Sequence, residues 1–203
     1  MLRHIDIRSK RLKPLRPLLN CWTDLNVRYA RDWKGKDCPW WYNERTFVGL
    51  LAAAAWIVGG HSLEEYSTRK HRRRSQYPGR GDLYFKLDSV SYIAEAKHEW
   101  VVASWRSTMR SKLLRKSLRV ARKSVVDAET PRGRKLGLLF VVPMVPKRER
   151  GDILKLVDRL IKKLRNDVSY DAAAWVFSNE AKLPHDRYHV YPGVALLVLE
   201  KPA

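Results

Sequence analysis

The chain has 203 residues, which is enough for one domain with a sizeable core. Its 41 Lys and Arg residues outnumber its 21 Asp and Glu residues, and the formal net charge of +20 favours a polyanionic partner, with nucleic acid preferred over a membrane surface. A membrane protein is not expected, because no apolar run reaches the ~20 residues of a spanning helix. Cys21 and Cys38 are too few for a disulfide framework or a four-ligand zinc site, so a reducing cytoplasmic location is expected.

The first 20 residues carry six Lys or Arg against the single acid Asp6. Pro14 and Pro17 interrupt any long helix there. We therefore predict a basic N-terminal arm over residues 1–20, followed by a single domain over residues 21–203. Some of the aromatic side chains of residues 21–42 are expected to pack on the core of that domain. Trp40, Trp41 and Tyr42 could instead stack on bases, although core packing is the favoured interpretation for them.

A first helix is predicted over residues 43–58. Asn43 is suited to cap it, and Glu44 lies in the first turn, where the helix dipole favours a negative charge. Apolar residues recur at a spacing of three and four up to residues 59–60, where two glycines end the pattern.

Three strand-like segments follow, at residues 63–70, 81–85 and 92–97. A basic run at residues 69–74 ends in a turn signal at residues 77–81, which contains Pro78. The turn-prone pair Asp88-Ser89 separates the second and third segments and predicts a hairpin between them.

The remaining chain alternates helices and strands. A helix is predicted over residues 104–126, with apolar residues on one side and cations on another. A buried strand over residues 136–142 and a strongly amphipathic helix over residues 152–166 come next. Two apolar strands, 172–177 and 194–199, close the sequence. This order predicts an α/β fold with a mixed central sheet flanked by helices.

Two carboxylates and one ammonium lie close together in the second and third strand-like segments. Residues two apart share a strand face, so Glu95 and Lys97 point the same way, and the hairpin carries Asp82 back alongside them. Carboxylates are hard oxygen ligands suited to Mg²⁺, which polarises a phosphodiester and lowers the pKa of a bound water. We expect Asp82 and Glu95 to bind Mg²⁺, or Mn²⁺ in its place, together with the carbonyl of Ala96. Lys97 then orients the water or stabilises the developing charge, and Glu44 is a further candidate carboxylate.

The set formed by Glu44, Gly81-Asp82 and Glu95-Ala96-Lys97 resembles the PD-(D/E)XK superfamily of restriction-endonuclease-like nucleases. The resemblance covers residues 43–142, in which the predicted order is helix, three strands, helix, strand. It implies an αβββαβ core and a Mg²⁺-dependent endonuclease. It also implies that Asp82 and Glu95 bind the metal, that Lys97 aids catalysis and that Glu44 joins the site. One departure is Gly81, which stands where the family has a proline before its first acid.

The excess positive charge supplies candidate contacts to nucleic acid, with DNA expected in preference to RNA. Each cation that neutralises a phosphate adds to the salt dependence of binding. The candidates lie in the basic run and along one side of the second helix: Arg72, Arg73, Arg74, Lys112, Arg115, Arg119 and Arg122. A homodimer or a larger DNA-processing complex is a further expectation, since cutting both strands at one place often needs two active sites.

Simpler interpretations exist for each feature. Glu95 and Lys97 can form an exposed ion pair with Asp82 as a turn acid, and the basic residues can be a solvated surface. A non-catalytic nucleic-acid-binding module with the same fold, or a protein that binds an acidic protein partner, would carry the same charge. The histidines are expected to be structural or superficial: His98 on the opposite strand face from Lys97, and His185 and His189 at the surface.

Overall fold

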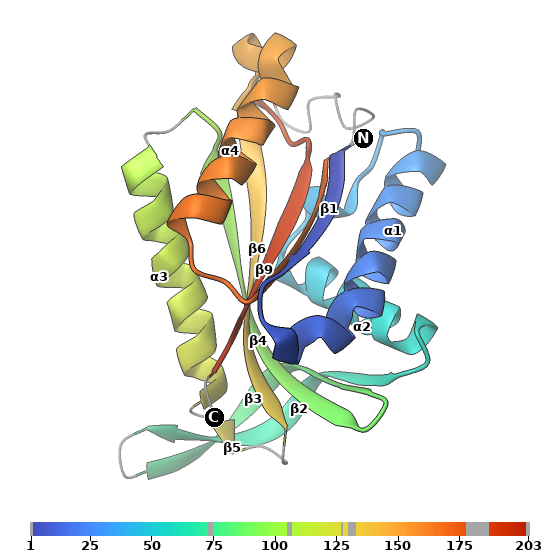
Figure 1. The fold of residues 1–203 in the computed structure, drawn as a ribbon, viewed down its shortest axis with the longest axis vertical. Helices are drawn as coiled ribbons and strands as arrows, with labels where there is room; N and C mark the ends of the chain where they lie inside the picture. Colours follow the sequence, from blue (N-terminus) through green and yellow to red (C-terminus); the bar gives the residue numbers. More distant parts are fainter. Residues whose placement is uncertain are drawn as a thin grey trace.

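The computed structural model describes residues 2–72, 75–104, 107–126, 128–129, 133–177 and 187–201. It is a mixed α/β fold in which helices flank a central sheet (Figure 1). The helices are α1 (Arg16–Asp32), α2 (Glu44–Ile57), α3 (Ser107–Val126) and α4 (Ile153–Asp167). The strands are β1 (Leu2–Ile7), β2 (His61–Arg72), β3 (Ser75–Leu87), β4 (Val90–Val102), β5 (Ala128–Glu129), β6 (Arg134–Pro146), β7 (Ala172–Phe177), β8 (His189–Val190) and β9 (Gly193–Glu200).

The sheet has nine strands within these ranges, in the order β1-β7-β9-β6-β4-β3-β2-β5, and β8 pairs with β6. β4 and β6 are parallel and are joined through α3, whereas the other paired strands are antiparallel. The mixed sheet and the order helix, three strands, helix, strand agree with the sequence prediction, with β5 as a short addition before β6. None of the described helices is both long and apolar enough to cross a membrane.

Strand alternation divides the core into two layers. Ala94 and Ala96 of β4 pack with side chains of α1 and α2 on one face of the sheet. Leu139 and Val141 of β6 pack with side chains of α3 and α4 on the other face. The central strands are therefore covered on both faces, which explains why β6 reads as a nearly continuous apolar run.

The predicted first helix and the predicted hairpin are confirmed. The Asn43 side chain accepts a hydrogen bond from the backbone N–H of Arg45 at 3.1 Å and so caps α2. The hairpin joins Leu87 to Val90 through two residues, and Asp88 has the left-handed φ of 50° that a tight turn requires.

Residues 2–20 are folded into the domain and do not form the basic arm that we predicted. β1 pairs antiparallel with β7, from Leu2 opposite Phe177 to Ile7 opposite Ala172. Pro17 lies in the first turn of α1, where its missing N–H has no helical partner to lose. Charge alone suggested an arm, but the alternating Ile5 and Ile7 pack against the core.

All of the predicted strands except β7 are longer than predicted, and the predicted turn at residues 77–81 is wrong. Those residues belong to β3, and Pro78 lies opposite Arg69 in the pairing with β2. β3 pairs with β2 alone in that region, which is the strand-edge situation that tolerates a proline. Similarly, β6 continues through Pro143, which lies opposite Val101.

The aromatic-rich segment before α2 packs as predicted. Trp40 has no exposed surface and its indole N–H donates to the carbonyl of Tyr191 at 2.8 Å. Trp41 is also buried, whereas Tyr42 remains 46% exposed. Most of this aromatic surface therefore stabilises the fold.

Candidate active site

The sheet splits beside the predicted triad. β3 and β4 pair from Leu87 opposite Val90 to Leu83 opposite Ala94, and no further pair follows. Beyond that point β3 continues in partnership with β2, and β4 continues in partnership with β6 (Figure 1). We call this point the sheet fork, and the first residues past it are Asp82 and Glu95.

At the sheet fork, the side chain of Asp82 accepts a hydrogen bond from a backbone N–H of β4. Its Oδ2 accepts the N–H of Ala96 at 2.7 Å. Ala96 would face Gly81 if the antiparallel ladder of β3 and β4 continued, and a backbone carbonyl would then have been its partner. The carboxylate therefore satisfies a backbone group that the split leaves without a strand partner.

Lys97 and Glu44 meet at the same place. The Lys97 ammonium donates to the carbonyl oxygen of Ala96, and its Nζ lies 3.8 Å from Oε2 of Glu44. Burial raises the pKa of Glu44 above its usual value; the Lys97 ammonium opposes this shift, and the charges of Asp82 and Glu65 add to it. The first turn of α2 therefore places the Glu44 carboxylate, whose pKa is raised, next to the Lys97 ammonium of β4.

Glu95 is buried, with 4% of its surface exposed. It lies one residue before Ala96, whose N–H is bound by Asp82. Burial, and then the charges of Glu95 and Asp82, raise the pKa of Tyr66 to about 12. Both carboxylates therefore act on the same phenol, and the structure brings together all four side chains of the predicted site.

Two neighbouring residues of β2 were not predicted from the sequence. Glu65 would face Asp82 in the pairing of β2 with β3, but it has a left-handed φ of 49° and leaves the ladder there. Its carboxylate lies 3.6 Å from Nε of Arg45 and 3.8 Å from a guanidinium nitrogen of Arg80. Tyr66 follows directly. In the sequence, the acidic pair at residues 64–65 within a predicted strand is the only signal that could have placed Glu65 near the candidate site.

The residues that the structure describes contain no group of three or more His, Cys, Asp or Glu side chains arranged to hold a metal ion. The sheet fork offers the carboxylates of Asp82 and Glu95 and the carbonyl of Ala96, with Glu44 beside the ammonium. All of these are oxygen donors of the kind that Mg²⁺ prefers.

The helix α3 carries the cations predicted to contact nucleic acid, and its C-terminal half passes close to this site. Lys112, Arg115 and Arg119 are exposed, and Arg122 is half-buried. Gly137 of β6 lies opposite Glu95, and a Cβ added to it would come within 2.8 Å of Cα of Arg122. The C-terminal half of α3 therefore crosses the strand next to Glu95 with no room for a side chain between them.

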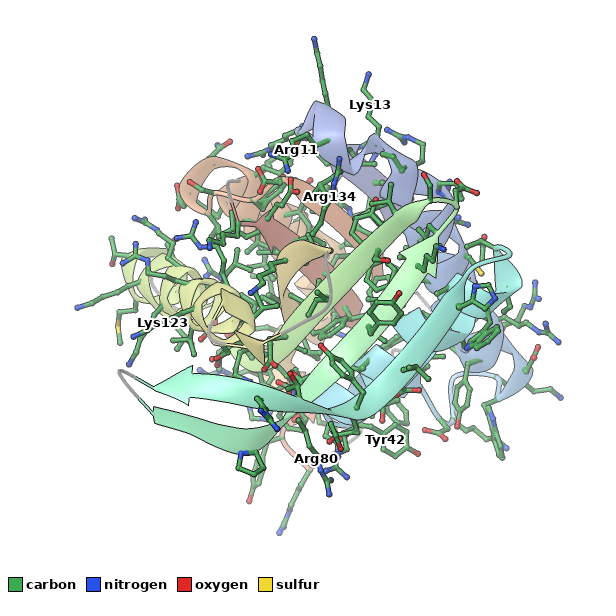
Figure 2. The ribbon with its side chains drawn as sticks, turned by 90° about the horizontal axis from the view of Figure 1, so that it is seen from below. Arg11, Lys13, Tyr42, Arg80, Lys123 and Arg134 are labelled. Atoms are coloured by element: carbon green, nitrogen blue, oxygen red, sulfur yellow. The ribbon has the colours of Figure 1, made fainter. Side chains whose placement is uncertain are left out.

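The β2–β3 ribbon, meaning the paired stretch past the sheet fork, extends past the C-terminal end of α3 (Figure 1). Figure 2 shows it with Arg80 on the ribbon and Lys123 on α3. Its end pairs with β5, the strand that follows α3. Of the cations predicted here, Arg72 is the last residue of β2, and Arg73 and Arg74 lie outside the described residues.

His98 lies on the side of β4 that faces α2. Burial lowers the pKa of His98 to about 4, and its ring packs 5.3 Å from that of Phe47 on the α2 side. His189 lies in the short strand β8, and His185 lies outside the described residues.

The chain has no match among known families. Comparisons with protein-family models, with curated proteins and with solved structures all find none. The geometry of the sheet fork is therefore what bears on function.

Proposed function

We propose that this protein is a metal-dependent nuclease that hydrolyses phosphodiester bonds, with DNA as the expected substrate. The observation that carries the proposal is the convergence of Asp82, Glu95 and Lys97 where β3 and β4 separate. The element order from α2 to β6 supports a restriction-endonuclease-like core as the fold behind it.

The residues at the sheet fork fit a divalent cation. The Lys97 ammonium pairs with Glu44, and Asp82 accepts the N–H of Ala96, the residue between Glu95 and Lys97. The raised pKa of Glu44 reflects its burial and, with a smaller effect, the charge of Asp82. The carbonyl of Ala96 already accepts a cationic donor. Asp82, Glu95 and this carbonyl would hold Mg²⁺, or Mn²⁺ in its place. When bound, the metal supplies Lewis-acid activation of the phosphate and a water of lowered pKa.

The protein's own groups have separate roles. Lys97 places its positive charge where negative charge develops on the phosphate oxygens, or holds the attacking water. Glu44 positions the Lys97 ammonium through their ion pair. The exposed cations of α3 hold the phosphate backbone beside the site, which does not require any particular base sequence.

Cleavage assays on supercoiled plasmid, single-stranded DNA and RNA, with and without Mg²⁺ or Mn²⁺, test this function. We expect metal-dependent cleavage, and a loss of at least about 100-fold in rate for Glu95→Gln and for Lys97→Ala. Glu99→Gln is the matched control, because Glu99 lies on the same face of β4 but hydrogen-bonds Ser117 of α3. The proposal is contradicted if both variants still cleave at the wild-type rate. It is also contradicted if the wild type cleaves none of the three substrates.

The exposed cations of α3 also favour a second candidate, a nucleic-acid-binding module without catalysis. It predicts an affinity for nucleic acid that falls with salt and does not change when the metal is removed or when Asp82 is replaced in Asp82→Asn. If cleavage is found, breakage of both strands at one place would indicate that two copies act together.

A further inference from the structure

Tyr66 has an unusual place beside the proposed metal ligands. It lies opposite Gly81 in the pairing of β2 with β3, and Gly81 precedes Asp82. A Cβ added to Gly81 would overlap Cζ and the hydroxyl oxygen of Tyr66 and would lie 2.6 Å from its Cε1. The hydroxyl end of the ring therefore occupies the space where a side chain at position 81 would be, next to Asp82.

The Tyr66 hydroxyl is buried and has no hydrogen-bond partner among the residues that the structure describes. A buried polar group without a partner is rare in folded proteins and costs about 1–3 kcal/mol. By contrast, the neighbouring Tyr84, whose ring lies 6.4 Å away, shares a hydrogen bond of 3.1 Å with Ser91. An unsatisfied donor beside carboxylates indicates a group whose partner forms in another state of the site.

Both carboxylates of the proposed metal site act on this phenol. Their charges and the burial of the ring raise its pKa to about 12, so the hydroxyl keeps its proton at neutral pH and is a hydrogen-bond donor. Carboxylates that bind a metal are themselves usually held by hydrogen bonds from a surrounding group, which fixes their orientation.

We propose that Tyr66 is a positioning residue of the active site, whose hydroxyl donates a hydrogen bond to the carboxylate pair of Asp82 and Glu95 when a divalent cation is held there. This inference rests on the proposed metal-dependent function. It assigns Gly81 a role as well, because only a glycine leaves room for the phenol at this point.

Titration calorimetry with Mn²⁺ and with Mg²⁺, together with urea unfolding in the presence and absence of Mn²⁺, tests the inference on Tyr66→Phe. We expect Mn²⁺ affinity to fall about 10-fold or more. The metal-free Phe variant should be as stable as the wild type or more stable, because it lacks the unsatisfied hydroxyl. Tyr84→Phe is the control and should keep the Mn²⁺ affinity of the wild type.

The outcomes separate the two proposals. If the wild type binds Mn²⁺ and Tyr66→Phe binds it equally well, the role of Tyr66 is overturned while the metal site stands. If Tyr66→Phe is less stable than the wild type without metal, the hydroxyl serves the fold and the inference is again overturned. If the wild type binds neither metal, both the metal-dependent function and this inference fall.

Discussion

The sheet has one half that is buried on both faces and one half that divides. Every residue of β7 is buried, and β9 is nearly so, with Ala173 and Ala174 packed in opposite layers of the core. In the other half, β3 and β4 separate after Leu83 and Ala94. There a carboxylate, that of Asp82, replaces a strand as the partner of a backbone N–H.

If the sheet fork is the active site that we propose, this difference separates the part of the sheet that provides stability from the part that carries the reaction. The buried half satisfies its backbone through continuous ladders, and the buried charge of β9, that of Glu200 at its last residue, is paired with Arg11 and Arg134. The divided half contains a left-handed Glu65, a buried Glu95 and the Tyr66 phenol, which has no hydrogen-bond partner in the described part of the chain. Each of these features costs free energy. Strained and charged groups of this kind persist where a ligand or a reaction uses them, and the rest of the sheet must compensate for them.

The largest expected effect comes from moving a charge into the buried half. Ala174→Asp places a carboxylate at a position with no exposed surface, and we expect a loss of more than about 4 kcal/mol in the free energy of unfolding. Glu95→Gln removes a charge from the divided half and should leave stability unchanged or higher. Urea unfolding monitored by tryptophan fluorescence measures both. Equal losses for the two variants would remove the distinction between the halves.

A smaller effect is expected from Gly81→Ala. The added methyl group overlaps the Tyr66 ring, so the ring must leave its place, at a cost of about 1–3 kcal/mol. Because the phenol is displaced, the variant should also show the weakened Mn²⁺ affinity of Tyr66→Phe. Calorimetry and urea unfolding check the two effects. In a protein that also carries Tyr66→Ala, Gly81→Ala should lower the free energy of unfolding much less. If the loss is the same as in the presence of Tyr66, the added methyl group clashes with a different part of the protein.

The cations of α3 are expected to contribute to DNA binding, whereas an exposed cation of α4 is not. Arg115→Gln should weaken binding to duplex DNA and lower the slope of log K against log salt by about 1, because one phosphate contact is lost. Fluorescence anisotropy at several salt concentrations measures the slope. Lys162→Gln is the control, since Lys162 is exposed on α4 and pairs with Asp158 at 2.8 Å. An equal change of slope in both variants would indicate that α3 makes no specific contribution.

The smallest effect concerns the pH dependence of stability. Because the pKa of Glu44 is raised in the folded protein, its ionisation opposes folding. The stability that it contributes is present below its ordinary pKa and is lost as the pH rises through the folded value. Glu44→Gln should therefore gain stability relative to the wild type as the pH is raised from 4 to 7, in thermal unfolding at each pH. A relative gain on acidification would contradict this sign.

Local patterns predicted much of the fold and the core of the site. The cap at Asn43, the turn at Asp88 and the alternation of Glu95 with Lys97 are properties of neighbouring residues, and the structure contains each of them. The pairing of β1 with β7 joins residues from opposite ends of the chain, such as Ile5 and Ala174, and no local pattern encodes such a partner.

The sheet fork could not be predicted for a related reason. Its position depends on where two strands stop pairing. On the β3 side, the residues past that point carry the turn signal at residues 77–81, which predicted a loop in place of a strand. On the β4 side, the residues keep a strand-like composition and give no sign that a partner is lost. The left-handed backbone at Glu65 has no sequence signal, because glycine or asparagine is the usual residue there. Tyr66 was missed in consequence, since its position depends on both features.

The close approach of α3 to Gly137 makes the helix and its strand a single mechanical unit. With no side chain between Arg122 and Gly137, the two elements cannot slide past each other without first separating. If α3 binds a polyanion as we propose, a pull on the helix would be transmitted to β6, and through its parallel ladder to the strand that carries Glu95. Gly137 would then couple tension in the bound molecule to the position of the proposed site.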